Sequence, residues 1–400
     1  MELEKNRQTE IVEPYKLPVG WKWCKQSEVC KLVDGEKIAD KEYPYLEVKY
    51  LRGTKEKSFV TSGKLIKKGT KVILVDGENS GEVFAIHEEG YMGSTFQALS
   101  IENVDENYLQ YFITTKKDLY RNNKKGSAIP HLNKDLFKNM PFPLPPTLAE
   151  QQRIVNRIES MFAKLDQAQE KAQSVLDSFE TRKAAILHKA FNGQLRIDNE
   201  ELKIEDWEEK SFSDLGTSNL GKMLDQNKNT GDEIRYLRNI NVRWFDFDLS
   251  DLLTMRAKPE EIKKLSVKKG DLFICEGGEP GRCAVWKDEN ADLIFQKAIH
   301  RFRPNDGVSS DFVAYVLYYY NQIGKLSDYF TGTTIKHLTG QSLAKLPIKL
   351  PPLNYQLSIV NFLDSVLEKE SRAKEAAGAV LDQIALLKKS ILARAFRGEL

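Results

Sequence analysis

Several short motifs in this sequence have the residue types of a catalytic site, but each lacks something that its chemistry requires. The segment GTSNLGKM (216–223) approaches a phosphate-binding loop, yet Met223 stands where the Mg²⁺-binding hydroxyl is needed. The segment IHEEG (86–90) has no second histidine for a zincin helix. The five histidines do not cluster at the spacing of metal ligands. Adenine methyltransferases have an Asp or Asn directly before a Pro-Pro pair, whereas both Pro-Pro pairs here follow a leucine. We therefore predict a non-catalytic chain that binds no metal or cofactor itself.

The cysteines and the apolar pattern indicate the compartment. Cys24, Cys30, Cys275 and Cys283 form no CxxC pair, which favours reduced thiols over a disulfide framework or a zinc site. Residues 1–15 are polar and mixed in charge, unlike a signal peptide. No stretch approaches the roughly 18 apolar residues of a membrane span. We expect a cytoplasmic protein without a membrane partner.

Side chains suited to nucleic acid gather beside loops in both halves of the chain. Arg and Asn can contact guanine and adenine edges in bidentate fashion, and Lys beside hydroxyl-bearing loops suits phosphates. The DNA-contacting residues that we predict are Lys49, Arg52, Lys124, Lys125, Ser127, Arg238, Asn239, Asn241, Arg243, Arg282, Thr333, Thr334 and Lys336. For any one of them the alternative is an ordinary solvated side chain.

The overall charge gives this prediction little support. The chain has 60 basic and 58 acidic residues, a formal charge of +2. Residues 15–146 hold 21 basic and 17 acidic residues, giving +4, and residues 207–346 hold 20 of each. A protein that grips DNA alone is usually more basic, so partner proteins would have to supply part of the phosphate contact.

An internal repeat identifies the elements that position these clusters. Residues 150–195 and 355–400 align without a gap at an offset of 205, with identical residues at positions such as Gln151, Ile154, Phe191 and Gly193. Upstream, KGSAIPHL (125–132) parallels TGTTIKHL (331–338). The globular parts diverge while the helices agree, which indicates one scaffold carrying two different readers. The alternative is an old duplication that has decayed without functional meaning.

Each repeat contains a heptad stripe that a single helix cannot bury. The helix-pairing residues that we predict are Ile154, Ile158, Leu165, Ala172, Val175, Phe179 and Ile186, then Ile359, Leu363, Ala377, Val380, Ile384 and Ile391. Two like units favour an antiparallel coiled coil. The alternative is that each helix packs on its own globular domain or on another protein. Glu370 interrupts the second stripe.

The helix ends can also be predicted. Thr147 and Glu150 form a capping box before the first helix, and Asn354 caps the second. Gly193 and Gly398 stand where a left-handed residue ends a helix. Each helix then spans about 40 residues, or roughly 60 Å.

The globular parts are predicted to be mixed α/β. Strands are expected at 71–75, 82–86, 271–275 and 283–286, and helices at 106–123 and 310–326. The aromatic stripe of Tyr315, Tyr318 and Tyr319 in the last of these is predicted to be core rather than a platform for stacked bases.

The duplicated helices carry a family resemblance. LPPTLAEQQRIVNRIE…KAAILHKAFNGQL and LPPLNYQLSIVNFLD…KKSILARAFRGEL look like the two conserved helical regions of the specificity (S) subunits of Type I restriction-modification systems. LPVGWKW (17–23) resembles the opening of their first recognition domain, and GDLFICEGGEPGRCAVW (270–286) resembles a strand-turn-strand of the second. A departure is Leu357 and Ser358, where the first helix has Gln152 and Arg153.

The resemblance implies an α+β fold with a pseudo-twofold internal repeat. The expected parts are an N-terminal tail (1–16), target-recognition domain 1 (17–146), conserved helix 1 (147–195), a linker (196–206), target-recognition domain 2 (207–350) and conserved helix 2 (351–400). It also implies a non-catalytic DNA-binding subunit whose two domains each read half of a bipartite, asymmetric double-stranded DNA site. The helices would set the spacing and dock two modification subunits that carry S-adenosylmethionine and methylate adenine. Restriction subunits, with ATP and Mg²⁺, would complete a larger assembly.

Two other functions stay open at this point. The chain could be a coiled-coil scaffold that reads no sequence, or a self-sufficient DNA-modifying enzyme. If the helices act as a ruler, a four-residue insertion near Ala172 changes the gap in the target and leaves both half-sites unchanged.

Overall fold

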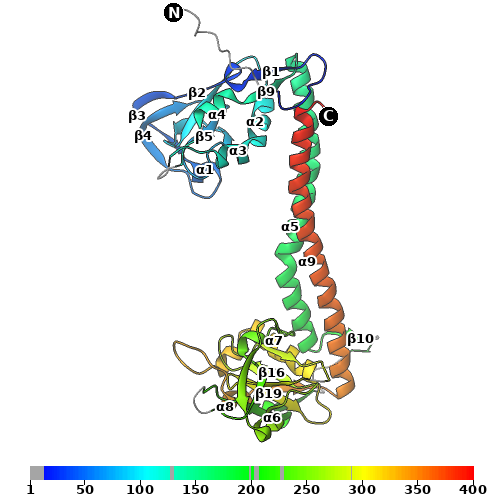
Figure 1. The fold of residues 1–400 in the computed structure, drawn as a ribbon. Helices are drawn as coiled ribbons and strands as arrows, with labels where there is room; N and C mark the ends of the chain where they lie inside the picture. Colours follow the sequence, from blue (N-terminus) through cyan, green and yellow to red (C-terminus); the bar gives the residue numbers. More distant parts are fainter. Residues whose placement is uncertain (1–12, 127–129, 198–199, 202–206, 226–228, 290) are drawn as a thin grey trace, which may run out of the picture. The chain divides into compact units, whose positions relative to one another are not determined.

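The computed structural model describes residues 13–126, 130–197, 200–201, 207–225, 229–289 and 291–400. The chain forms two compact units, Met1–Gln173 with Gly378–Leu400, and Ser174–Ala377. Each unit contains one globular domain together with part of each long helix, α5 (Leu148–Phe191) and α9 (Leu353–Phe396) (Figure 1). Among the described residues, no helix has the length and apolarity needed to cross a membrane.

The first domain is built on three groups of strands. Strand β1 (Lys22–Lys25) pairs with β9 (Pro141–Leu144), which leads directly into α5. A four-stranded sheet has the order β2 (Cys30–Val33), β8 (Phe96–Ile101), β5 (Lys71–Leu74) and β6 (Val83–Ala85). Strands β3 (Glu36–Leu46), β4 (Phe59–Ile66) and β7 (Gly90–Met92) close a small barrel. The helices are α1 (Val48–Leu51), α2 (Glu106–Thr115), α3 (Lys117–Asn122) and α4 (Lys134–Asn139).

The second domain repeats this order of strands, but in its described residues the third sheet is open and not a closed barrel. Strand β12 (Glu208–Ser211) pairs with β20 (Pro347–Leu350), and a four-stranded sheet has the order β13 (Gly216–Leu220), β19 (Ile299–Pro304), β16 (Leu272–Cys275) and β17 (Cys283–Val285). A third sheet has the order β15 (Leu253–Ala257), β14 (Asp232–Leu237) and β18 (Leu293–Phe295), in which β14 and β18 are parallel, as β3 and β7 are in the first domain. The helices are α6 (Pro259–Leu265), α7 (Ser310–Gln322) and α8 (Gly340–Ala344). A two-stranded pair, β10 (Arg196–Ile197) and β11 (Glu200–Glu201), precedes this domain. The mixed α/β class and the internal repeat are therefore confirmed.

Each domain core continues into both long helices. In the first unit, Ile154 and Ile158 of α5 and Leu392 and Phe396 of α9 lie in one buried cluster with the domain. In the second unit the same is true of Phe191, Ile359 and Leu363. The sequence left open whether the two long helices pack on each other or on the globular domains. In the structure each helix does both.

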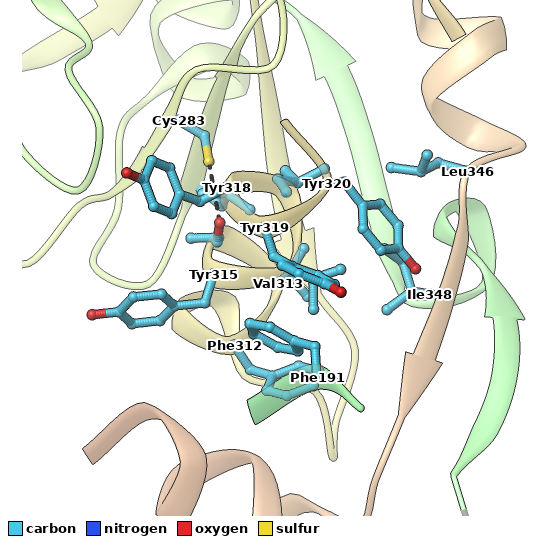
Figure 2. Packing of buried hydrophobic residues seen from close by; sticks show 14 of the residues in the cluster. Phe191, Cys283, Phe312, Val313, Tyr315, Tyr318, Tyr319, Tyr320, Leu346 and Ile348 are labelled. Carbon is cyan, nitrogen blue, oxygen red and sulfur yellow. Dashed lines mark hydrogen bonds between the residues drawn. The ribbon is translucent and has the colours of Figure 1, made fainter. Parts of the chain in front are cut away.

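Figure 2 shows the junction of α5 with the second domain. The Phe191 ring lies 5.7 Å from that of Phe312 and 5.2 Å from that of Tyr319, centroid to centroid. Tyr315, Tyr318 and Tyr319 of α7 are all buried, so their predicted role as core residues is confirmed. Because these rings are buried, they cannot serve as a base-stacking surface.

The long helices are antiparallel in each unit. In the first unit, Arg153 donates to the Leu400 carbonyl (3.1 Å), and Asp166 pairs with Lys388 (2.6 Å). In the second unit, Lys374 lies over the Phe179 ring (4.4 Å), and Arg182, further along α5, pairs with Glu370, which comes earlier in α9. Thus residue numbers rise along α5 as those of the facing residues fall along α9. In Figure 1 the last turns of α9 lie beside the first turns of α5.

The interruption of the stripe at Glu370 is filled by an interhelical ion pair. The Arg182 guanidinium donates to the Glu370 carboxylate from Nε (2.9 Å) and lies 2.8 Å from it at Nη2. A charged residue is therefore accommodated in the seam because the opposite helix supplies its partner.

Several details of the helices differ from the prediction. Val380 is 39% exposed, so it does not belong to the buried stripe. Asn354 lies inside α9, which begins at Leu353 directly after the Pro-Pro pair, so it is not the cap. Only half of the capping box forms, since the Glu150 N–H donates to Thr147 Oγ1 (3.2 Å) while the Glu150 carboxylate pairs with Arg153.

The C-terminal ends of the two long helices are as predicted, whereas the helices expected within the domains end earlier. Gly193 and Gly398 have φ of +66° and +74°, the left-handed conformation that ends a helix. The helix expected over 106–123 breaks at Lys116, where the Thr114 and Thr115 hydroxyls bond to backbone carbonyls and compete with helical pairing. The helix expected over 310–326 ends at Gln322, just before Gly324 (φ +78°).

Candidate nucleic-acid interface

Three segments converge at one end of each domain. The first follows β3 or β14, where the chain turns into α1 or into the 3₁₀ turn η4 (Asn239–Asn241). The second is the glycine turn after β5 or β16. The third precedes α4 or α8 and consists of residues 125–126 with 130–131 in the first domain and residues 331–337 in the second; we call it the bridged loop because its first and last residues pair with each other. The predicted DNA-contacting residues belong to these three segments or adjoin them.

The bridged loop of the second domain is held from both sides. Thr331 and His337 exchange backbone hydrogen bonds of 2.8 and 2.9 Å, and the Leu338 N–H donates to the Glu276 carbonyl (2.8 Å). Gly332 has φ +89°, and a Cβ there would lie 2.2 Å from the Ile335 carbonyl oxygen. Only glycine therefore allows this closure.

The closure of this loop exposes the side chains at its tip. Thr333, Thr334 and Lys336 are exposed, offering two hydroxyls and one ammonium group beside each other in sequence. Ile335 is 67% exposed, a large apolar side chain displayed between them. Hydroxyl and ammonium groups bind phosphates, and an exposed aliphatic group can contact a thymine methyl group.

The Arg/Asn segment of the second domain lies against its glycine turn. Asn239 Nδ2 donates to the Gly277 carbonyl (3.4 Å), and the Arg282 guanidinium donates to the Asn239 carbonyl (2.9 Å). A Cβ on Gly277 would lie 3.1 Å from Nδ1 of His337, so the bridged loop adjoins the same turn. The three segments thus form one continuous surface in this domain.

The first domain brings together the corresponding segments. Lys125 and His131 exchange backbone hydrogen bonds of 3.0 and 2.8 Å, and the Gly77 N–H donates to the Pro130 carbonyl (2.7 Å). Nδ1 of His131 lies 2.6 Å from the Asp76 carboxylate. Ser127 lies outside the described residues, so its predicted contact has no structural account.

Carboxylates neighbour most of the predicted cations. In the first domain, Arg52 pairs with Glu82, and the Lys124 ammonium lies 2.6 Å from Glu78. The hydrogen bond from Lys124 lowers the pKa of the Glu78 carboxyl group. Lys49 is an exposed residue of α1.

Lys125 and two arginines of the second domain also lie beside carboxylates. Lys125 lies 2.6 Å from Asp135, and its hydrogen bond lowers the pKa of that carboxyl group. Arg238 lies 2.6 Å from Asp251, and Arg243 lies 3.3 Å from Asp248. These ion pairs leave the candidate surface with little net charge.

Two of the predicted residues are structural. Asn241 is 2% exposed, and its amide is used entirely by backbone groups, accepting from Arg238 N (2.9 Å) and donating to the Asp248 and Asp251 carbonyls (2.9 and 3.2 Å). The expectation that Asn241 reads a base is therefore corrected. The side chain of Arg282 is 14% exposed and bonds to the Asn239 carbonyl and the Glu279 carboxylate, so it braces the surface.

The prediction also missed Ile335. Its signal was present in the paired segments KGSAIPHL and TGTTIKHL, which both place an isoleucine three residues before the shared leucine.

The described residues give no support to two other kinds of site, a metal-ligand cluster and a reactive thiol. Among them, no group of three or more His, Cys, Asp and Glu side chains is placed to hold a metal ion. All four thiols are buried, and burial raises the pKa of Cys24 and of Cys30 to about 12, which disfavours the nucleophilic thiolate.

Comparison with known proteins gives a consistent result. A family model described as the Type I restriction modification DNA specificity domain matches residues 18–176 and again residues 204–377. The MjaVIII specificity subunit of Methanocaldococcus jannaschii is 26% identical over 409 residues, covering 94% of this chain and 93% of the relative. The StySPI specificity subunit of Salmonella potsdam is 22% identical and covers 96% of this chain and 90% of the relative.

Solved structures share the fold. The HsdS subunit from Thermoanaerobacter tengcongensis superposes with a TM-score of 0.64 at 19% identity, covering 97% of this chain and 99% of that one. A chain from a structural study of assembly and conformational transition in a type I restriction-modification system gives a TM-score of 0.71 at 18% identity, covering 97% of this chain and all of the other.

Proposed function

The chain belongs to the family of Type I restriction-modification specificity subunits, and we propose that each of its two domains reads one half of a split, asymmetric DNA target. The observation that carries this proposal is the repeated surface. Both domains bring the same three segments together on four-stranded sheets with the same strand order. The side chains on the first segment differ, since it carries Lys49 in the first domain and Asn239 in the second, although each domain has an arginine there, Arg52 or Arg243. Unlike side chains on like frames would read unlike half-sites.

Within this proposal, the bridged loops and their neighbours contact the backbone and the base edges. Lys336 and the threonines before it suit phosphates, while the exposed part of the Arg/Asn segment suits base edges. The two long helices would fix the gap between the half-sites.

We further propose that catalysis belongs to partner subunits. Two modification subunits would bind S-adenosylmethionine and methylate adenine, and restriction subunits would bring ATP and Mg²⁺. The long helices are suitable docking elements, because Leu386 and Leu387 of α9 are 67% and 50% exposed in the chain alone. Partner subunits would also add the positive charge that this chain lacks.

The decisive experiment compares Lys336→Ala with Lys263→Ala, each assembled with the modification subunits. Lys263 is an exposed residue of α6. This helix follows the last residue of β15, which pairs with the first residue of β14. The candidate interface lies at the opposite end of β14, so Lys263 is remote from it along the strand. We expect Lys336→Ala to weaken DNA binding about three- to tenfold and to flatten its salt dependence by about one counterion. Lys263→Ala should do neither.

The target itself is tested by mapping methylated adenines at single-molecule resolution. The proposal predicts a split, non-palindromic motif with a fixed gap. A palindromic motif would contradict the two-reader proposal, and equal affinity for target and random DNA would leave only a scaffold.

A further inference from the structure

The same buried glutamine occurs at the start of each long helix. Gln151 of α5 and Gln356 of α9 occupy identical positions in the repeat, and their exposed fractions are 2% and 0%. Each lies in the first turns of its helix, shortly after a Pro-Pro pair. Glutamine is usually a surface residue, so two buried copies require an explanation in terms of their partners.

Gln356 joins three separate elements of the second unit. Its Oε1 accepts a hydrogen bond from the backbone N–H of Ser309 (2.8 Å), the residue that caps α7. Its Nε2 donates to the Gly307 carbonyl (3.0 Å) and to the Pro351 carbonyl (2.8 Å). One amide therefore connects the long helix, the Pro-Pro turn and the loop that starts the domain helix.

Gln151 makes two of these three contacts in the first unit. Its Oε1 accepts from the backbone N–H of Asp105 (2.7 Å), the residue that caps α2. Its Nε2 is directed to the Pro145 carbonyl at a longer distance of 3.5 Å. Since the surrounding domain sequences have diverged, the shared arrangement is a property of the joint itself.

These contacts differ in kind from the apolar packing around them. The aliphatic and aromatic side chains between each domain and its helices hold the surfaces together, but such packing has little directional preference. Hydrogen bonds from one planar amide are directional and, when buried, are costly to leave unmade. An amide bonded to the domain helix start and to the turn therefore restricts the angle between domain and long helix.

We propose that Gln151 and Gln356 are positioning residues that fix the orientation of each recognition domain on its helix, and so the gap between the two half-sites. This inference rests on the proposed function. Two buried side chains that do not contact DNA would therefore determine how strongly the subunit prefers one gap length over another.

The experiment uses Gln151→Met and Gln356→Met, which keep side-chain length and remove the hydrogen bonds. Gln152→Met is the matched control, because Gln152 is the exposed neighbour and, among the described residues, its side chain bonds along its own helix to Asn156 (3.0 Å). Each variant is assembled with the modification subunits and given DNA with the wild-type half-sites and gaps that are native, one base pair shorter or one longer. Methylation rates on the three DNAs and binding to single half-sites are measured.

We expect either Met variant to reduce the preference for the native gap by about tenfold, the factor that corresponds to one or two lost hydrogen bonds. Single half-site affinity and the half-site sequences should stay as in the wild type, and Gln152→Met should change nothing. An unchanged gap preference would overturn the inference, as would a loss of single half-site binding, which would make the glutamine a fold-stabilising residue only. If the wild-type complex showed no split motif at all, the proposed function would fail instead.

Discussion

Lengthening both long helices together should change the gap in the DNA target by a calculable amount. The facing pairs Arg153–Leu400 and Asp166–Lys388 place Ala172 opposite Leu381 within the first unit. Four residues inserted after Ala172 and four before Leu381 keep the helices paired. Each insertion adds about 6 Å of length and about 40° of rotation, at roughly 1.5 Å and 100° per residue.

The size of the expected change follows from DNA geometry. A base pair adds about 3.4 Å and about 35°. The added length therefore corresponds to about two base pairs and the added rotation to about one, so we expect the gap to grow by one or two base pairs. Both half-sites should stay the same, because no residue of either recognition surface changes.

Single-molecule methylation mapping of cells that carry the lengthened subunit checks this prediction. A control with four residues inserted after Asp288, an exposed residue between β17 and β18, should keep the native gap. The reasoning would be refuted by an unchanged gap in a lengthened subunit that still methylates, or by a changed half-site sequence.

Two further predictions concern stability. In a double-mutant cycle of Arg182→Met with Glu370→Gln, we expect a coupling of about 1 kcal/mol, because the pair is partly exposed; a coupling near zero by denaturant unfolding would show that the ion pair only tolerates a charge in the seam. His300 is 1% exposed, with Nε2 at 2.9 Å from the Leu338 carbonyl, and burial lowers its pKa. As pH falls below about 6.5, the unfolded chain therefore takes up a proton before the folded chain does, and stability is lost. His300→Gln, which copies Gln97 at the matching strand position, should lose less stability between about pH 7.5 and about pH 5.5; equal losses in urea unfolding would contradict this explanation.

The sequence predicted the long-range architecture well because that architecture is periodic. The stripe at Ile154, Ile158, Ile359 and Leu363 is buried as expected, and both helices end at the predicted glycines. Val380 shows the limit of the method, since a heptad pattern states which residues share a face and cannot state how far that face is covered.

The interface was predicted less well because it depends on pairing between segments distant in sequence. Asn241 and Arg282 have the right chemistry for base contacts, but they serve backbone groups of their own domain. The roles of Gln151 and Gln356 could not be predicted either, since each depends on a helix cap nearly fifty residues away in the chain.

The first unit is discontinuous, and this has a consequence for how the protein is made. Phe396 packs against Tyr108 and Phe112 of the first domain, with ring centroids 5.0 and 5.4 Å apart. The second unit, Ser174–Ala377, is one uninterrupted stretch, so it is fully synthesised before the last segment of the first unit, Gly378–Leu400. At ribosomal rates of about 5–20 residues per second, the first domain waits roughly 10–40 s for the segment that completes its core. The domain that emerges first is therefore the last to mature, and its uncovered apolar surface would be a natural client for chaperones during that interval.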